Sequence, residues 1–250
     1  MNEIARLRMF AGPNGSGKST IKSVIHPELL GVYINPDDIE KDIRECGFLD
    51  LKRYQVATDK PDILGFFNSS ILLDQAGLLD KVGNLRFDDD KLDFSSIQVN
   101  SYFASVAADF MRRKLLDCRT SFSFETVMSS PDKIKFLQKA WQQGFRTYLY
   151  FIATEDPLIN ISRVRNRVRL GGHSVPDDKI IARYDRSLDL LLEAVRYTNR
   201  AYIFDNSGHS ILWLAEINDG KSLTMKTNRM PAWFKRAVWD KMATMEVKKP

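Results

Sequence analysis

The chain has 250 residues, of which 44% are hydrophobic and 28% are charged, a balance typical of a soluble globular protein. No apolar run approaches the roughly 20 residues of a membrane-spanning helix, and the N-terminal MNEIARLR lacks the apolar core of a secretion signal. Cys46 and Cys118 lie far apart in the sequence, which argues against a metal site and favours a cytoplasmic protein. The net charge of +5 fits a phosphorylated small molecule or a nucleic acid as partner.

Five short apolar runs predict buried strands that alternate with helical patterns. The alternation predicts an α/β fold of the P-loop NTPase type, with a parallel five-stranded sheet and helices on both faces, in one domain covering residues 1–250. Ligands bind such sheets beyond the carboxyl ends of the strands. The predicted strands are Leu7–Ala11, Gly31–Asn35, Ser121–Glu125, Thr147–Thr154 and Ala201–Asp205. The predicted helices include Ser19–Ile25, Pro36–Cys46 and Pro176–Tyr197.

Two segments depart from this alternation. Residues from about 49 to 100 predict a helical insertion, in which the acidic run at 88–90 could bind a metal or form a solvated loop. Residues from about 208 to 250 predict a C-terminal extension with a helix over Pro231–Ala243. Trp233 and Trp239 in this helix are expected to be packing residues.

The sequence GPNGSGKS at residues 12–19 follows the first predicted strand and matches G-x-x-x-x-G-K-[ST], the Walker A or P-loop pattern. Glycines let the main chain curl so that successive N–H groups point at phosphate oxygens, and the following helix adds its positive end. The lysine gives the phosphates a positive charge, and the serine hydroxyl is a magnesium ligand. We therefore expect ATP and Mg²⁺ as cofactors. The expected nucleotide-binding residues are Gly12, Asn14, Gly15, Ser16, Gly17, Lys18, Ser19 and Thr20, with Ser19 on the metal.

P-loops occur both in energy-coupling ATPases and in kinases. The motif GPNGSGKST is common in transporter-type ATPases. These proteins also carry an LSGGQ-like signature and an apolar strand that ends in Asp-Glu. This sequence has neither, and its nearest candidate strand, LYFIATED, has Thr154 at the position of the first acid. The sequence therefore favours a kinase.

A kinase needs a carboxylate that takes the proton of the attacking hydroxyl. Asp37 and Asp38 follow the second predicted strand, at the same sheet edge as the P-loop, so both are candidates. Acids in a first helical turn also stabilise the helix dipole, and that structural role stays open. Glu125 and Thr126 end the third predicted strand, where a carboxylate could hold substrate hydroxyls or pair with a structural arginine.

The segment RVRNRVRLGGHSVP predicts an arginine-rich lid over about 161–175. Arg163 and Arg167 share one face of a helix that two glycines then break. Such a lid can close over the transferring phosphate and neutralise its charge, although a basic solvated face is the alternative. His173 is a candidate substrate contact or helix cap, and Arg183 and Arg186 on the next helix could also point inward.

These motifs together resemble the zeta-toxin family of bacterial P-loop kinases. The resemblance rests on the P-loop, YINPDD after the second predicted strand, FET after the third, RVRNRVRLGGH, and the following RYDRS. It runs from about Arg6 to Asn206, without the insertion. It implies ATP- and Mg²⁺-dependent phosphorylation of a sugar hydroxyl on UDP-N-acetylglucosamine, with an antitoxin protein as partner.

The resemblance also implies roles for individual residues. Lys18 and Ser19 would serve the nucleotide, Asp37 would be the catalytic base, Glu125 would contact the acceptor, and Arg167 would bind phosphate. The family's second phosphate-binding arginine falls near His173 in this sequence. Arg163, Arg183 or Arg186 could supply that charge instead.

Two other functions remain open from the sequence. A polynucleotide-end kinase also pairs a P-loop with a following aspartate, and the chain is basic. A nucleotide-dependent switch would need the P-loop alone and would transfer no phosphate.

Overall fold

The computed structural model describes residues 4–172 and 174–246. The contacts of the chain define two compact units: unit 1 contains Met1–Leu29 and Glu125–Pro250, and unit 2 contains Leu30–Phe124. Unit 2 includes the segment that we expected as an insertion. Among the described residues, no helix combines the length and the apolar character that crossing a membrane requires.

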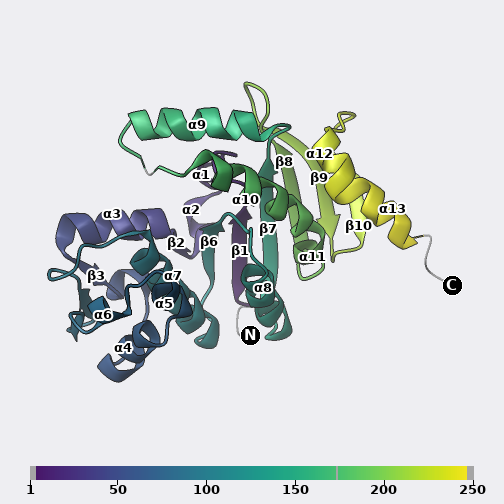
Figure 1. The fold of residues 1–250 in the computed structure, drawn as a ribbon. Coiled ribbons are helices and arrows are strands. Elements are labelled where there is room, and N and C mark those ends of the chain that lie inside the picture. The colour runs from purple at the N-terminus through teal and green to yellow at the C-terminus, as the bar shows by residue number, and fades with distance from the viewer. Residues whose placement is uncertain (1–3, 173, 247–250) are drawn as a thin grey trace. The chain divides into compact units, whose positions relative to one another are not determined.

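Unit 1 is built on strands in the order β10-β9-β8-β7-β1 (Figure 1). β1 and β7 pair in parallel, as do β7 and β8, whereas β9 and β10 form an antiparallel hairpin that pairs antiparallel with β8. The strands are β1 (Arg6–Ala11), β7 (Arg146–Ala153), β8 (Arg200–Asp205), β9 (Leu212–Asn218) and β10 (Ser222–Met225).

The helices of unit 1 follow the loops at the strand ends, and α8 and α11 pack against β7 (Figure 1). A short π-helix, η2, joins α12 to α13, and α11 also packs against η2. The helices are α1 (Lys18–Ser23), α8 (Asp132–Gln142), α9 (Pro157–Arg169), α10 (Asp177–Asp189), α11 (Leu191–Val195), α12 (Ala232–Phe234), η2 (Lys235–Trp239) and α13 (Asp240–Glu246).

Unit 2 contains a parallel strand pair, β2 and β6, and a separate antiparallel sheet in the order β3-β5-β4. Its longest helix, α7, packs against α3 and β2. The elements are β2 (Val32–Ile34), α3 (Pro36–Cys46), β3 (Phe48–Asp50), η1 (Lys52–Tyr54), α4 (Lys60–Asn68), α5 (Ile71–Gln75), α6 (Leu79–Val82), β4 (Arg86–Asp88), β5 (Lys91–Asp93), α7 (Ser101–Asp117) and β6 (Phe122–Thr126), with α2 (Pro27–Leu30) just before them. The last two residues of β6, Glu125 and Thr126, belong to unit 1.

The strand predictions are confirmed, because all five predicted runs form strands and pair in parallel within their units. The predicted insertion contains the helices α4, α5 and α6, and it also contains the sheet β3-β5-β4, which we did not predict. Each of its strands has only three residues, too few to show a period-two pattern. The acidic run is the hairpin turn of this sheet, where Lys52 Nζ lies 2.9 Å from Asp89 Oδ1 and 3.3 Å from Asp90 Oδ2.

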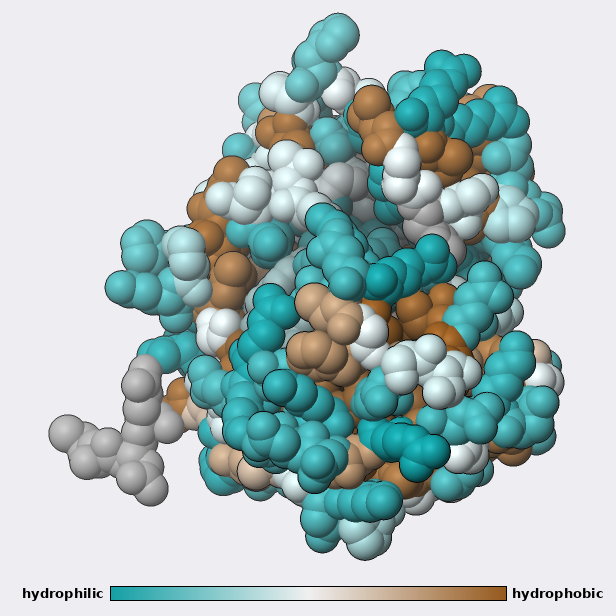
Figure 2. Space-filling model, turned by 90° about the vertical axis from the view of Figure 1, so that its left-hand side faces the viewer, coloured by the Kyte–Doolittle hydropathy of each residue, from teal (hydrophilic) through white to brown (hydrophobic). Residues whose placement is uncertain are grey.

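The face drawn in Figure 2 is mostly hydrophilic. Its hydrophobic side chains form separate groups among hydrophilic ones and not one continuous patch. Scattered apolar side chains of this kind are ordinary on a protein surface and need no partner to cover them.

The C-terminal extension is anchored to unit 1 by Trp233. Its side chain is 2% exposed and lies against Phe151 of β7, with ring centroids 6.2 Å apart. The indole Nε1–H donates a 2.8 Å hydrogen bond to Oδ2 of the buried Asp205. Trp239, which we also expected to be a packing residue, is 38% exposed. The anchor is therefore one tryptophan, and it fixes α12 at the carboxyl end of β8.

We expect Trp233→Ala to lower the free energy of unfolding of unit 1 by about 3–5 kcal/mol, because it empties a buried site. Trp233→Phe keeps most of the volume but removes the donor to Asp205, and should cost about 1–2 kcal/mol. Urea denaturation followed by circular dichroism measures both values. The matched control Trp239→Phe should change the value by less than about 0.5 kcal/mol. Equal effects at the two tryptophans would contradict the anchor.

Candidate functional site

The P-loop packs so closely against its neighbours that two of its glycines cannot carry a side chain. Gly12 has a φ of 143°, and a Cβ there would lie 2.0 Å from the Ile152 carbonyl oxygen of β7. Gly15 has a φ of 74°, and a Cβ there would lie 2.6 Å from the Asn160 carbonyl oxygen of α9. Both contacts are with main chain, which cannot move aside as a flexible side chain could. The loop is therefore pressed between the end of β7 and the start of α9.

Two asparagine side chains hold the loop by its carbonyl groups. Asn160 Nδ2 donates to the Asn14 carbonyl oxygen at 2.6 Å, and Asn206 Nδ2 donates to the Ser16 carbonyl oxygen at 2.8 Å. Asn206 follows β8, so the loop is fastened to elements on two sides. Hydrogen bonds that fix these carbonyls also fix the peptide planes whose N–H groups must face a phosphate.

A buried network sets the orientation of the Asn160 amide. Asn160 is 0% exposed, and its Oδ1 accepts a hydrogen bond from the Thr154 hydroxyl, which leaves Nδ2 as the end that faces Asn14. The Tyr184 hydroxyl of α10 donates to the Thr154 carbonyl oxygen at 2.6 Å. Burial raises the pKa of Tyr184, so this phenol stays protonated and remains a donor. The network thus joins β7, α9 and α10 to the P-loop.

The polar side chains of the P-loop point in different directions. Lys18 Nζ lies over the loop and donates to the carbonyl oxygens of Gly12 at 3.0 Å and Pro13 at 3.1 Å. Ser19 and Thr20 are exposed, whereas Ser16 is 0% exposed and its hydroxyl is buried under the loop. The first N–H groups of a helix have no acceptor within it, and in α1 these are the groups of Lys18 and Ser19. The Thr20 N–H already donates to the Gly17 carbonyl oxygen at 3.1 Å.

Glu125 contacts the P-loop serine directly. Ser19 Oγ donates to Glu125 Oε2 at 3.2 Å, and the Glu125 residue is only 8% exposed. This partner was not expected from the sequence, where we considered an acceptor hydroxyl or an arginine. Thr126 is half-buried, and its hydroxyl accepts from the Met128 N–H at 3.0 Å, which shapes the loop after β6.

The arginines of α9 divide between two faces. Arg163 and Arg167 are half-buried, whereas Arg165 is exposed and forms an ion pair with Asp177 of α10. Within the described residues, Nη1 of Arg163 is buried without a hydrogen-bond partner, which is costly for a guanidinium unless an anion binds there. Arg163 and Arg167 are therefore the arginines of this helix that can serve a ligand.

The remaining lid residues lie on α10 or before it. Arg183 is half-buried, and Arg186 Nε donates to the Ser129 carbonyl oxygen at 3.2 Å. The helix α9 ends at Arg169, as the two glycines predicted. His173 lies outside the described residues, so its expected contact with substrate stays a prediction.

Asp37 and Asp38 belong to unit 2 and are exposed in the first turn of α3. The Asn35 side chain caps this helix by accepting from the Asp37 N–H at 3.1 Å, and Pro36 occupies the first turn, as the sequence predicted. Asn35 follows Ile34, which pairs with Phe124 of β6. The cap fixes where the Asp37 side chain leaves the helix.

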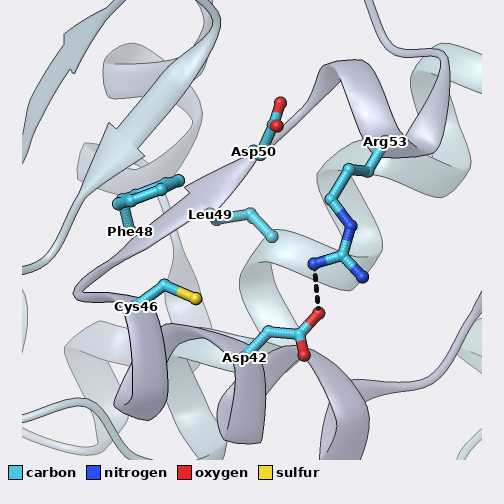
Figure 3. Close-up of a pocket in the computed structure, with 6 residues that line it drawn as sticks. All are labelled: Asp42, Cys46, Phe48, Leu49, Asp50 and Arg53. Carbon is cyan, nitrogen blue, oxygen red and sulfur yellow. Dashed lines mark hydrogen bonds and ion pairs between the residues drawn. The ribbon is translucent and has the colours of Figure 1, made fainter.

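A shallow pocket in unit 2 lies between α3 and β3 (Figure 3). Arg53 Nη1 donates to Asp42 Oδ2 at 3.0 Å and closes one side, and Cys46 and Phe48 line another. The third charged residue of the lining, Asp50, accepts from the Lys52 N–H at 3.0 Å. It contains none of the residues that the sequence assigned to the site.

Sequence reasoning did not identify Asn160, Thr154 or Asn206 as residues that hold the P-loop. Asn160 stands beside Ile161 and before Val164, all of which are buried on α9. An asparagine at a buried helical position is a signal that could have been used, because a buried amide must find partners.

No family model matches this chain. An uncharacterized protein of Haemophilus influenzae is 32% identical over 63 residues, which make up 25% of this chain and 45% of that protein.

Among solved structures, a chain of the native AvrRxo1-ORF1:-ORF2 complex matches with a TM-score of 0.57 and 14% identity, covering 94% of this chain and 63% of that chain. The same complex with ATP matches with a TM-score of 0.55 and 15% identity, covering 96% and 64%. A weaker match, to the PezAT chromosomal toxin-antitoxin system of Streptococcus pneumoniae, has a TM-score of 0.47 and 15% identity and covers 100% and 89%.

The chain thus spans less than two thirds of the AvrRxo1 chains that it matches. At these identities the likeness establishes the fold. The α/β fold predicted from the alternation of strands and helices is confirmed, with a parallel sheet flanked by helices, and β9 and β10 are additional to the five predicted strands.

We expect Asn160→Leu to lower the free energy of unfolding of unit 1 by about 2 kcal/mol, because the Asn14 carbonyl and the Thr154 hydroxyl both lose a buried partner. Urea denaturation measures the change. Asn166→Leu is the matched control, since Asn166 is exposed on the same helix, and it should change the value by less than about 0.5 kcal/mol. A loss at Asn160 no larger than at Asn166 would show that the amide does not hold the loop.

Proposed function

We propose that this chain is an ATP- and Mg²⁺-dependent phosphotransferase that moves the γ-phosphoryl group of ATP to a hydroxyl of a small molecule. The observation that carries the proposal is the P-loop, held by Asn160 and Asn206, with Lys18 and Ser19 at the start of α1. That the complex sharing this fold contains ATP in one of its structures supports the choice of nucleotide.

The P-loop residues would bind the phosphates of ATP. Main-chain N–H groups of the loop and of the first turn of α1 would donate to the phosphate oxygens, apart from those of Ser16 and Thr20, which donate to the carbonyl oxygens of Pro13 and Gly17. Lys18 would exchange its two carbonyl acceptors for the β- and γ-phosphates. Because the Ser16 side chain is buried under the loop, we assign it no contact through its hydroxyl. Gly12 and Gly15 would serve by keeping the loop open to the phosphates.

Ser19 and Glu125 would hold the magnesium ion. Mg²⁺ prefers oxygen ligands and is usually bound by one or two protein groups together with phosphates and waters. A hydroxyl and a carboxylate 3.2 Å apart beside the P-loop fit that requirement. Within the described residues no cluster of three or more His, Cys, Asp or Glu side chains could hold a metal alone, so the protein would supply few of the ligands. The ion, when bound, neutralises charge on the phosphates.

Asp37 would act as the catalytic base. It would accept the proton of the acceptor hydroxyl while the acceptor oxygen bonds to the γ-phosphorus and the bond to the β–γ bridging oxygen breaks, releasing ADP. Asp37 is exposed at a capped helix start, so an acceptor can reach its carboxylate. Arg167 and Arg163, with Arg183, would neutralise the charge that moves onto the bridging oxygen.

The acceptor and partner follow from the resemblance. UDP-N-acetylglucosamine is the first acceptor to test, with Asp38, Thr126 and His173 as candidate contacts to it. An antitoxin protein is the proposed macromolecular partner, and we place the protein in the cytoplasm. The occurrence of a matched chain in the AvrRxo1-ORF1:-ORF2 complex supports a partner protein.

We expect Asp37→Asn to lower the rate of phosphate transfer at least about 100-fold, because the base can no longer take a proton. Incubation with γ-labelled ATP, Mg²⁺ and UDP-N-acetylglucosamine, or a metabolite extract analysed by mass spectrometry, measures the transfer. ATP affinity should stay unchanged. Asp42→Asn, on the same helix, should keep the wild-type rate. Transfer by Asp37→Asn at the wild-type rate would remove the assignment of the base.

We expect Glu125→Gln to weaken metal binding by about tenfold, because the carboxylate beside Ser19 loses its charge. Electron paramagnetic resonance of Mn²⁺ titrated into the protein with ADP measures the affinity without turnover. The matched control Glu193→Gln, exposed on α11, should bind Mn²⁺ as the wild type does. If Glu125→Gln instead raises only the KM of the acceptor, the carboxylate contacts the acceptor and not the metal.

A further inference from the structure

The sheet of unit 1 has two unlike faces. Along β7, Thr147, Leu149 and Phe151 are 0% exposed, whereas Tyr148 and Tyr150 between them are half-buried. The strand β8 alternates in the same way. Helices normally cover both faces of a parallel sheet, and its strands then bury nearly every residue. Alternation along β7 and β8 instead indicates that one face is partly open to solvent.

On the Phe151 side of the sheet, Trp233 packs against Phe151. The other side is covered at β1, where Phe10 and Arg8 are 0% and 5% exposed, and opens toward β8 and β9. On this other side, aromatic side chains from four strands stand in a row. Phe10 and Tyr150 stack with centroids 5.0 Å apart, Tyr150 and Tyr202 at 4.9 Å, and Tyr202 contacts Trp213 at 6.0 Å. Trp213, at the end of the row, is 40% exposed. We call this side the tyrosine face.

Positive side chains surround this row. The Arg8 guanidinium lies 4.9 Å from the centroid of Tyr148, and Lys226 Nζ lies 4.9 Å from that of Trp213. Arg146 and Arg200 are exposed at the strand starts. The carboxylate that contacts these cations, Glu216, is shared by Arg200 at 3.6 Å and Lys226 at 3.2 Å. Arg8 is only 5% exposed, so the accessible cations are Arg146, Arg200 and Lys226. Within the described part of this face these three outnumber the carboxylate of Glu216, so its exposed part is positive.

The stacking of the rings and the charge of the tyrosine face indicate which kind of partner could bind there. Stacked aromatic rings have their faces covered by each other, and cations lie over Tyr148 and Trp213, so little ring surface is left for nucleic acid bases to stack on. A second copy of the chain would bring two positive surfaces together. Guanidinium groups and phenol hydroxyls at the ring edges are hydrogen-bond donors that match carboxylates. Tyrosine, tryptophan and arginine are also the residues that dominate protein–protein interfaces.

We infer that the exposed part of the tyrosine face is a docking surface for an acidic segment of a partner protein. It is formed by Arg146, Tyr148, Tyr150, Arg200, Tyr202, Trp213 and Lys226. The surface lies on the sheet itself and uses none of the P-loop residues. Binding there is independent of phosphate transfer.

Fluorescence anisotropy of a labelled ten-residue peptide of eight glutamates and two tyrosines tests this inference. The wild-type chain should bind the peptide, and Arg146→Glu/Arg200→Glu should weaken binding at least tenfold. Trp213→Ala removes an aromatic contact without changing the charge, and should weaken binding about threefold. Circular dichroism and thermal melting establish that each variant is folded.

The matched control is Lys41→Glu/Lys81→Glu, the same change of charge at two exposed lysines of unit 2. It should bind the peptide within twofold of the wild type. Equal weakening by the two double variants would show that binding follows net charge, and would overturn the inference. Tighter binding of a labelled 20-nucleotide oligo-dT than of the peptide, lost in Arg146→Glu/Arg200→Glu, would assign the face to nucleic acid instead.

Discussion

The close approach of the P-loop main chain to its neighbours is the constraint on which the candidate site depends. A Cβ added at Gly12 would lie only 2.0 Å from a carbonyl oxygen of β7. The main chain of the loop therefore lies directly against the strand. Its carbonyls are already bound by Asn160 and Asn206, so the peptide planes are set before any ligand arrives. Preorganised donors of this kind bind phosphate without a further loss of main-chain entropy.

The helix α9 connects this loop to the proposed arginine lid. Asn160 near its start binds the loop, and Arg163 and Arg167 lie one and two turns further along the same helix. The same helix thus carries the amide that holds the loop and the arginines of the proposed lid. Tyr184 adds α10 to this connection through Thr154. The P-loop and the proposed lid are therefore connected through α9 and α10 within unit 1.

The sequence predicted what local patterns encode and missed what long-range contacts create. Strands, the P-loop and the capped start of α3 follow from neighbouring residues, so their identities were readable. The hydrogen bond between Ser19 and Glu125 joins residues 106 positions apart, and no local pattern specifies it. The same is true of Asn206 on the Ser16 carbonyl, which joins residues 190 positions apart. Such pairs form only when the sheet brings the strand ends together.

The tyrosine face shows a different limit of sequence reading. The run YLYFIA in β7 was read as a continuous apolar strand because tyrosine counts as apolar, and this hid a period of two. Tyrosine is amphipathic, because its ring packs against apolar neighbours while its hydroxyl remains hydrated. It therefore suits a sheet face that is partly exposed to solvent. Had the tyrosines been counted as polar, β7 and β8 would have read as strands with one solvated side. Because β7 and β8 alternate in this way, the tyrosine face stays partly exposed, as the proposed docking surface requires.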